Sequence, residues 1–345
     1  MPLDLTGQPL IDRSDFQQLL ETGTFGRWAE QAISLHDKGY CLVDLGSSDW
    51  LEKTDDVVNA LQPRLEAELK LWESGESGPP RLQDGWIDHG SIRALALEPV
   101  VLDLLRHLYG REPFAFQTLN FAVGSEQHFH SDAVHFHSYP HGFMCGVWIA
   151  LQDVQPESGP LIYFPGSHRM PYLSARSLGL DREAVLGEPH PQRLFEPSWQ
   201  QAVSEHAFEK QQFLPKRGEV LIWHANLLHG GAPVQERTSR RWSQVNHYFF
   251  SDCLYTTPMR NFGAGEGGTS LRNPFDLAKD TTRFSEVEWR DVNRMKKRKS
   301  IIDKIRGNRG DFNPCNEGWH EEKGSSSQAF FGPAARGRHR LERRD

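Results

Sequence analysis

The sequence predicts an all-β core, an antiparallel sandwich or barrel, with helices before it and a charged tail after it. Between about residues 113 and 260, short runs of β-branched and aromatic residues alternate with Gly, Pro and Ser. This pattern is typical of antiparallel strands joined by turns. The ten tryptophans and twenty phenylalanines in 345 residues also suit a well-packed β-rich interior.

Residues 1–112 are predicted to be mainly helical with one strand. In residues 14–39 the apolar side chains recur at roughly helical spacing, and Gly39 provides a stop. The run YCLVDLG predicts a short strand. Residues 49–73 predict a second helical region that is broken or kinked near Pro63, and residues 74–85 have the composition of a loop. The clearest helix is LEPVVLDLLRHLYG, which ends at Gly110.

The β core is predicted from five runs, at residues 113–124, 141–154, 159–167, 218–225 and 243–252. A long polar insertion, residues 171–215, has weak helical signals and is typical of a lid or a substrate-facing segment. We expect residues 1–283 to form one domain and residues 284–345 to form a charged, partly flexible extension. The basic cluster at 294–299 is interpreted as a solvated helix face rather than an anion contact.

Composition restricts the possible function classes. The net charge of -7 gives no general reason to expect nucleic acid as a partner. No apolar run approaches the roughly 20 residues that span a bilayer. The first residues lack the apolar segment of a signal peptide, so we expect a cytoplasmic protein. The four cysteines are widely scattered without a CxxC pair, which disfavours a zinc knuckle or a disulfide scaffold.

A histidine-rich segment, QHFHSDAVHFH at residues 127–137, is the strongest candidate for a metal site. In a strand, residues two apart share a face, so His130 and Asp132 would project together. The later segment GEVLIWHANLLHGG offers His224 and His229 as a third ligand. We prefer His229 because two glycines follow it and allow the backbone to turn. Two histidines and one carboxylate on one face of an octahedron leave three positions open, as in non-haem Fe(II) oxygenases.

The remaining histidines of this region are expected to support the site or lie on the surface rather than bind the metal. His128 would share the face of His130, but three ligands from one strand cannot easily supply a facial set. His224 is interpreted as a core or pocket-lining residue. The residues after Asp132 fall in a loop or turn; they are His135, His137 and His141.

Three segments together resemble a known family. They are FHSDAVHF, GVWIALQDVQPESGPLIYFPGSHR and RGEVLIWHANLLHGGAPVQERTSRRW, and they span about Gln117 to Phe250. In this order the sequence resembles the phytanoyl-CoA dioxygenase family of Fe(II)/2-oxoglutarate oxygenases, which also includes bacterial hydroxylases such as ectoine hydroxylase. The resemblance implies a double-stranded β-helix, that is, a cupin-like jelly roll.

The resemblance also implies roles for individual residues. His130, Asp132 and His229 would be the iron ligands. An arginine eleven residues beyond the distal histidine would bind the far carboxylate of 2-oxoglutarate, and here that position is Arg240. A guanidinium pairs with a carboxylate through two parallel hydrogen bonds. Arg241 would point the other way on a strand, and Arg240 is the preferred choice.

Several weaker positions follow from the same resemblance. Gln117 matches a strand position that helps to orient the cosubstrate, with Asn120 as an alternative. Trp148 is interpreted as a core residue. Ser167 and His168 lie in the PGSH turn, which in the family shapes the entrance and otherwise simply forms a turn.

The activity implied by the resemblance is hydroxylation of a small organic substrate by O2 and 2-oxoglutarate, with release of succinate and CO2. Halogenating relatives replace the carboxylate by a small residue, whereas Asp132 is present here. No segment resembles a CoA-binding signature, which favours a free small molecule. Two alternatives stay open. One is a metal-binding, cupin-like isomerase or sugar-binding module, and the other is a catalytically degenerate family member that acts as a scaffold.

Overall fold

The structure, a computed structural model, describes residues 7–262 and 268–283. The predicted extension at 284–345, with its basic cluster, lies outside these residues. The α-helices are α1 Phe16–Glu21, α2 Ala29–Lys38, α3 Ser48–Ser74, α4 Gly90–Ala96, α5 Pro99–Tyr109, α6 Arg182–Gly187 and α7 Glu196–Glu205. The 3-10 helices are η1 Leu10–Asp12, η2 Gly26–Trp28, η3 Gly85–Ile87, η4 Asp132–Val134, η5 Pro156–Ser158, η6 Ser167–Arg169, η7 Pro191–Leu194 and η8 Pro258–Arg260.

The strands form one large antiparallel sheet and smaller ones. The large sheet has the order β1-β8-β5-β10-β3-β2, and a three-stranded sheet has the order β7-β6-β9. The main strands are β1 Tyr40–Asp44, β2 Arg81–Gln83, β3 Pro113–Phe121, β5 Met144–Ala150, β6 Leu161–Tyr163, β7 Gln211–Phe213, β8 Glu219–His224, β9 His229–Gly231 and β10 Ser243–Phe250. The peripheral strands are β4 His137–Tyr139, β11 Leu254–Thr256, β12 Leu271–Arg272, β13 Phe275–Asp276 and β14 Thr281–Thr282. Each of the five predicted runs contains a strand of the core.

An apolar cluster fills the space between the large sheet and the three-stranded sheet. Trp148, Leu221 and Val245 from the large sheet pack with Leu161 and Phe213 from the smaller one. Side chains of a strand alternate between its two faces, so each of these strands gives one set of residues to this interior. The two open sheets therefore form a sandwich of the jelly-roll kind. The prediction of an all-β core with flanking helices is confirmed.

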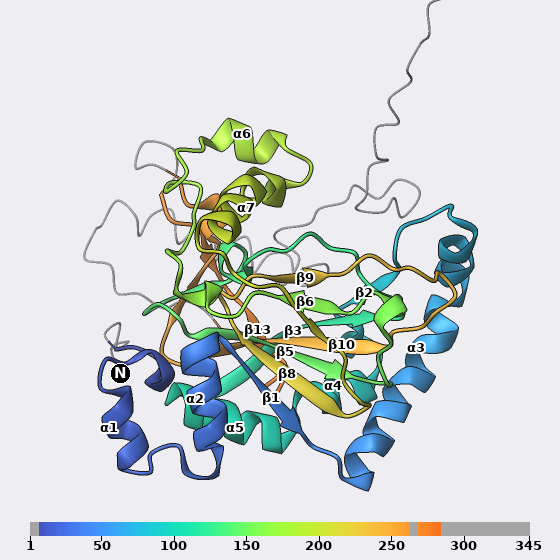
Figure 1. The fold of residues 1–345 in the computed structure, drawn as a ribbon, viewed down its shortest axis with the longest axis horizontal. Helices are drawn as coiled ribbons and strands as arrows, with labels where there is room; N and C mark the ends of the chain where they lie inside the picture. Colours follow the sequence, from blue (N-terminus) through green and yellow to red (C-terminus); the bar gives the residue numbers. More distant parts are fainter. Residues whose placement is uncertain (1–6, 263–267, 284–345) are drawn as a thin grey trace, which may run out of the picture.

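Helices from the N-terminal third cover the outer face of the large sheet. Buried side chains of α2, α3, α4 and α5 share one core cluster with the outward residues of β5, β8 and β10. Gly39 ends α2 at φ 81° and Gly110 ends α5 at φ 72°, and glycine adopts this left-handed conformation without steric cost. Both predicted stops are confirmed. Figure 1 shows α2 and α5 on the side of the sheets opposite α6 and α7.

Two expectations for the N-terminal third need correction. Of the break or kink expected near Pro63, the break is absent, because α3 continues past Pro63 to Ser74. Pro63 and Asn59 are exposed, so the Asn59 carbonyl that Pro63 leaves without its helical partner faces water, which can satisfy it. The segment predicted as a loop contains the edge strand β2, because Arg81–Gln83 pairs with β3. A three-residue strand has too few side chains to show an alternating pattern.

The helical part of the insertion at residues 171–215 packs against the segment that follows Asp132, whereas β7 at its end joins the three-stranded sheet. Val134 and Leu228 from the core share an apolar cluster with Val185 of α6 and Trp199 of α7. In Figure 1, α6 and α7 lie together on one side of the sheets. Among the described helices, none combines the length and the apolarity needed to cross a membrane.

Gly146, in β5, makes room for the indole of Trp223 on the neighbouring strand. A Cβ atom at residue 146 would lie 2.2 Å from ring atoms of Trp223. We therefore expect Gly146→Ala to lower the free energy of unfolding by about 1–3 kcal/mol through overpacking. Gly90→Ala is the matched control, because no atom lies within 4 Å of its Cβ position. Urea unfolding curves measure both changes, and equal midpoints for the two variants would contradict the packing argument.

Candidate metal centre

Backbone pairing brings the two predicted ligand segments together. The His130 amide donates to the His229 carbonyl at 2.8 Å, and the His229 amide donates to the His130 carbonyl at 3.0 Å. An isolated bridge at His130 thus takes the place of the strand in which His130 and Asp132 were expected to share a face. Asp132 begins the 3-10 helix η4, whose start is capped by the Ser131 hydroxyl accepting from the Ala133 amide. His130 and Asp132 therefore approach each other because a backbone bridge at His130 is followed by the turn of η4 at Asp132. The alternation of side chains along a strand is not the cause.

The two glycines after His229 serve close approach rather than turning. Gly230 and Gly231 lie inside strand β9. A Cβ at Gly230 would lie 2.7 Å from the Gln127 carbonyl oxygen, and one at Gly231 would lie 2.5 Å from the Ser125 hydroxyl. The reason given for preferring His229 was therefore wrong, although the choice of residue stands. Side chains at these positions would separate the two ligand segments.

His130, Asp132 and His229 lie together, as predicted. Their candidate ligand atoms are all within 4.8 Å of one another, and all three side chains are buried. The distance from His130 Nε2 to Asp132 Oδ1 is 3.5 Å, and that from His229 Nε2 to Asp132 Oδ2 is 3.7 Å. The group contains two nitrogen donors and one oxygen donor. This donor set is the one used by non-haem Fe(II) sites.

The hydrogen bonds of the two imidazoles engage Nδ1 with the backbone and turn Nε2 toward Asp132. His130 Nδ1 lies 3.0 Å from the His128 carbonyl, and His229 Nδ1 lies 3.0 Å from the Leu227 carbonyl. A carbonyl oxygen only accepts, so each Nδ1 donates, and in the neutral ring the lone pair is then on Nε2. The Gln127 amide nitrogen lies 3.4 Å from His130 Nε2, a contact that a metal at this site would replace. Burial lowers the pKa of His229 to about 4, so that its ring is neutral at physiological pH.

The carboxylate of Asp132 is held in its charged form. Burial alone would raise its pKa, but the imidazoles of His229, His247 and His130 outweigh this effect and hold the pKa well below its usual range. The Trp223 indole N–H donates to Oδ2 at 2.8 Å. An ionised carboxylate beside two imidazoles is a ready ligand set for a divalent cation.

Two residues of this centre were missed by the sequence analysis. Trp223 and His247 both contact Asp132 Oδ2, His247 through Nε2 at 3.4 Å. The sequence did contain a signal for His247. In strand β10, alternate residues share a face, so residue 247 lies on the same face as residues 243 and 245. A histidine at such a position in a strand surrounded by apolar residues points into the interior.

Comparisons with known proteins agree with this geometry. The family model of phytanoyl-CoA dioxygenase (PhyH) matches residues 35–242, more than half of the chain. The chain belongs to the phytanoyl-CoA dioxygenase family. It is 30% identical over 121 residues to phytanoyl-CoA dioxygenase domain-containing protein 1 of Danio rerio, covering 34% of this chain and 38% of that protein. It is 26% identical over 215 residues to the ectoine dioxygenase of Sphingopyxis alaskensis, covering 59% of this chain and 69% of that protein.

The match to relatives is partial, and the structural likeness concerns the fold. The chain spans less than half of the length of the domain-containing protein 1 relatives that it matches. The carbocyclase SnoK from nogalamycin biosynthesis superposes with a TM-score of 0.50 at 19% identity, covering 67% of this chain and 87% of that one. This likeness supports the fold that the phytanoyl-CoA dioxygenase resemblance implied.

The two arginines considered for binding 2-oxoglutarate, Arg240 and Arg241, lie in different environments. Arg240 pairs with Glu73 of α3, and its side chain is one-third exposed. Arg241 is 1% exposed, and its Nη1 donates to the Gly159 carbonyl at 3.0 Å. Burial lowers the pKa of Arg241 to about 10. The structure therefore places the residue favoured from the sequence toward the surface and its neighbour inside the sandwich.

Gln117 and Asn120 lie on opposite faces of β3. Gln117 is in the interior, with its amide oxygen 2.9 Å from His247 Nδ1. Asn120 instead donates to Gln244 on the helix-covered face. Of these two, only Gln117 shares the interior with the metal centre.

The insertion holds both flanks of the ligand segment. His128 Nε2 lies 3.0 Å from the Gln200 amide of α7. His135 Nε2 lies 3.1 Å from the Gln192 amide oxygen of η7. Neither histidine joins the three ligands. Both connect the predicted lid to the ligand segment.

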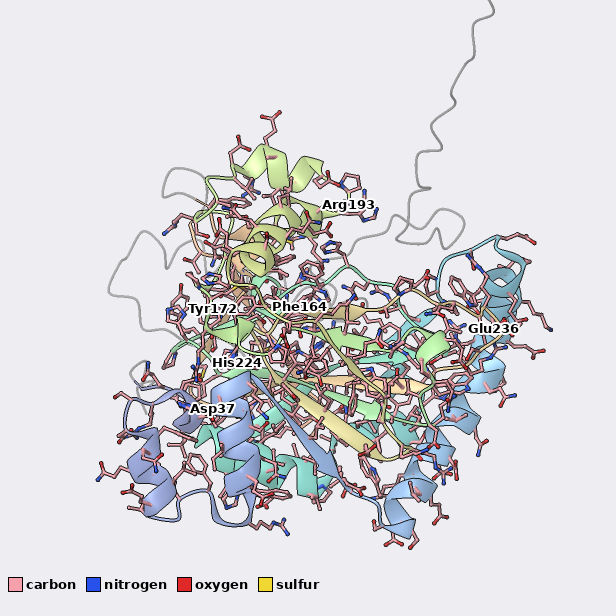
Figure 2. The ribbon with its side chains drawn as sticks, viewed as in Figure 1. Asp37, Phe164, Tyr172, Arg193, His224 and Glu236 are labelled. Carbon is pink, nitrogen blue, oxygen red and sulfur yellow. The ribbon has the colours of Figure 1, made fainter. Side chains whose placement is uncertain are left out.

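The other histidines lie outside the group of three. His224 Nδ1 accepts from the Asn226 amide, so its Nε2 keeps the proton and cannot bind a metal. Its ring centroid is 6.4 Å from that of Tyr172 (Figure 2). His137 contacts His141 at 2.6 Å. Trp148 is buried in the core as expected, and Ser167 and His168 form the η6 turn, where Ser167 accepts from the Leu228 amide.

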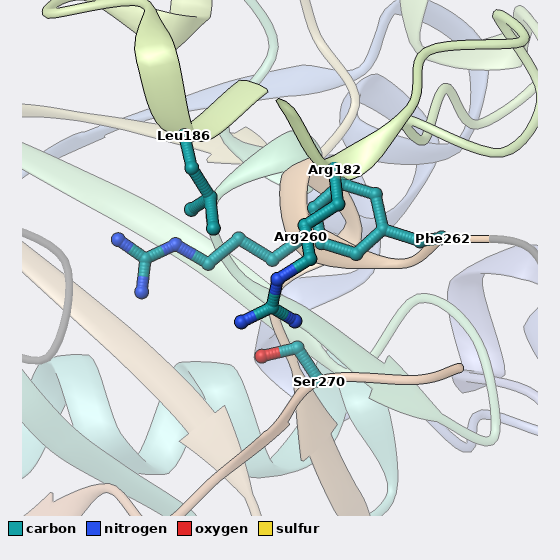
Figure 3. Close-up of a pocket in the computed structure, with 5 residues that line it drawn as sticks. All are labelled: Arg182, Leu186, Arg260, Phe262 and Ser270. Carbon is teal, nitrogen blue, oxygen red and sulfur yellow. The ribbon is translucent and has the colours of Figure 1, made fainter. Parts of the chain in front are cut away.

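A surface pocket of about 240 Å³ lies beside the insertion (Figure 3). Its lining includes no residue of the metal centre. Phe262, one of its walls, belongs to the same apolar cluster as Val134, which follows Asp132 by two residues. The pocket is therefore separate from the metal centre, and the apolar cluster that contains Phe262 and Val134 links the two regions. Its lining residues are Arg182, Leu186, Arg260, Phe262 and Ser270.

Buried histidines make the stability of the metal-free protein dependent on pH. Burial lowers the pKa of His168 and His137 to about 3 and that of His135 to about 4, from 6.5. Below pH 6.5 the unfolded chain binds protons that the folded chain excludes. The free energy of unfolding should therefore fall as pH decreases from 6.5 toward 4, by up to about 1.4 kcal/mol per pH unit for each histidine.

Urea unfolding at pH 7, 6 and 5 measures this slope. His168→Gln should reduce it by the share of one histidine. His206→Gln should not, because His206 is exposed and meets water in both states. A slope that His168→Gln leaves unchanged would show that His168 does not contribute.

Proposed function

We propose that the protein is a non-haem iron dioxygenase that uses 2-oxoglutarate and O2 to hydroxylate a small organic substrate, releasing succinate and CO2. The observation that carries this proposal is the group of His130, Asp132 and His229, in which each imidazole uses Nδ1 for a backbone carbonyl and turns Nε2 toward the ionised carboxylate. A structural neighbour, the epimerase SnoN, was crystallised with Fe3+ and alpha ketoglutarate; it superposes at a TM-score of 0.50 with 20% identity, covering 73% of this chain and 96% of that one.

The residues fit an iron ion. Two neutral imidazoles and one carboxylate would hold Fe(II) and leave three positions for cosubstrate and oxygen. The bound metal would supply oxygen activation coupled to decarboxylation of the cosubstrate. The polypeptide contributes placement. The backbone bridge fixes the separation of the two histidines, and the Trp223 indole orients the carboxylate.

The residues also fit the far carboxylate of 2-oxoglutarate. Within the described residues, Arg241 Nε and Ser243 Oγ are buried without a hydrogen-bond partner, and no carboxylate pairs with Arg241. Ser243 lies opposite Phe121 and Ala150, both interior residues, so it shares the interior face with Arg241. A buried cation without an anion is costly. An anionic cosubstrate would satisfy both groups, so Arg241 takes the role first given to Arg240.

The surroundings would protect the reaction from water. The centre lies between two packed sheets, and the insertion covers the residues on both sides of Asp132. Exclusion of water strengthens the electrostatic contacts inside and limits side reactions of a strong oxidant. A cupin-like isomerase or sugar-binding module would have no need for a buried arginine that lacks a carboxylate partner among the described residues. This arginine favours the oxygenase over that alternative, as the intact ligand set does over a degenerate scaffold.

Anaerobic addition of Fe(II) and 2-oxoglutarate should produce a weak metal-to-ligand charge-transfer band in the visible spectrum. His229→Ala should abolish the band and substrate-stimulated succinate release, because one of only three protein ligands is lost. His137→Gln, an equally buried histidine outside the centre, should retain both. Turnover retained in His229→Ala would place the third ligand elsewhere.

The two arginines make a matched pair of variants for cosubstrate binding. Arg241→Gln should weaken the apparent Kd for 2-oxoglutarate by at least about thirtyfold, since losing one partner of a buried charged pair costs about 2–5 kcal/mol. Arg240→Gln should change it by less than about threefold, because Arg240 pairs with Glu73. Titration of the charge-transfer band measures both values. A larger loss in Arg240→Gln would restore the original assignment.

A further inference from the structure

His247 places a third imidazole beside the carboxylate of the metal centre. It lies on the interior face of β10 and is 4% exposed. Its Nε2 is 3.4 Å from Asp132 Oδ2, and its Nδ1 is 2.9 Å from the Gln117 amide oxygen. Both ring nitrogens of a fully buried side chain thus face polar partners. Such an arrangement fixes the ring in one orientation.

We propose that His247 is a positioning residue of the metal centre, which holds Asp132 Oδ2 so that Oδ1 is presented to the metal. This inference rests on the proposed iron site. Oδ2 also accepts from the Trp223 indole at 2.8 Å. With two donors on Oδ2, the carboxylate cannot rotate freely about its Cβ–Cγ bond. It would bind the metal through one oxygen, as the three-position open site requires.

The geometry favours a positioning role over a fourth ligand. His247 is outside the group whose candidate ligand atoms lie within 4.8 Å of one another. Its Nε2 is directed to the oxygen that Trp223 already holds, and not to Oδ1, which faces His130 Nε2 at 3.5 Å. A fourth protein ligand would also leave only two coordination positions, and a chelating cosubstrate would fill both. No position would then remain for O2.

Gln117 acts through His247 in this arrangement. Its amide can accept from Nδ1–H through oxygen, or donate to an unprotonated Nδ1 through nitrogen. In the second arrangement the neutral ring carries its proton on Nε2, which is directed to Asp132; in the first, Nε2 donates to Asp132 only when both ring nitrogens carry a proton. The rings of Phe136 and Phe116, with centroids 5.2 and 6.1 Å from that of His247, pack beside it and limit its rotation. Gln117 was expected to orient the cosubstrate, whereas its amide lies against His247, on the side of the ring away from Asp132.

The test compares the metal affinity of three variants of the full-length, metal-free protein. His247→Leu removes the donor to Asp132, and His247→Gln restores an N–H close to the position of Nε2. Tyr248→Phe is the control on the same strand, since it removes the bond to the Ala96 carbonyl on the opposite face. Co(II) and Fe(II) affinities are measured anaerobically by competition with a chromophoric chelator, without cosubstrate or substrate. Melting temperatures of the metal-free proteins are recorded in parallel.

We expect His247→Leu to weaken metal binding by about 10- to 100-fold, the usual effect of removing such a supporting partner. His247→Gln should stay within about threefold of the native protein, and so should Tyr248→Phe. Native affinity in His247→Leu would overturn the proposal, and so would an equal loss in Leu and Gln variants. Failure of the native protein to bind either metal would instead refute the proposed iron site itself.

Discussion

The pair of backbone hydrogen bonds between His130 and His229 is the constraint on which the rest of the centre depends. It joins two segments almost a hundred residues apart and sets the distance between their imidazoles. Gly230 and Gly231 permit it, because a Cβ at either position would collide with the opposite segment. The side-chain geometry of the metal site is thus a consequence of close backbone packing. Ligand identity alone would not bring the three donors together.

A second constraint is the polar face of β10 inside an otherwise apolar sandwich. Ser243 and His247 of β10 share this face with the core residue Val245, and Arg241, two residues before the strand, lies on the same side. Burying polar groups without partners costs free energy, and the described chain satisfies them only in part. His247 finds Gln117 and Asp132, whereas Arg241 and Ser243 keep unpaired atoms. Arg241 and Ser243 are also the residues proposed to bind 2-oxoglutarate. The groups whose burial lowers the stability of the unliganded protein are thus the groups proposed to bind the cosubstrate.

Much of the architecture could be predicted from local patterns, because period-two alternation and glycine stops are local properties. The strands around Trp148 and Val245 and the helix stops at Gly39 and Gly110 are of this kind. The features that escaped depend on packing between distant segments. Whether Arg240 or Arg241 faces inward depends on the exact residue at which β10 begins, and a shift of one residue reverses the answer. His247 of β10 and Trp223 of β8 both reach Asp132 because β8, β5 and β10 pair in one register. That register depends on all three strands and cannot be read from any one of them.

The insertion is in direct contact with the segment that carries two of the candidate metal ligands. His128 and His135 lie on either side of the ligands His130 and Asp132, and both are bonded to the insertion through Gln200 and Gln192. The cluster of Val134, Trp199 and Leu228 adds apolar contacts along the same boundary. A rearrangement of the insertion would therefore act directly on the turn that begins at Asp132. The insertion and the residues proposed to hold the metal form one packed unit, so changes in the insertion should alter the geometry of the ligand segment.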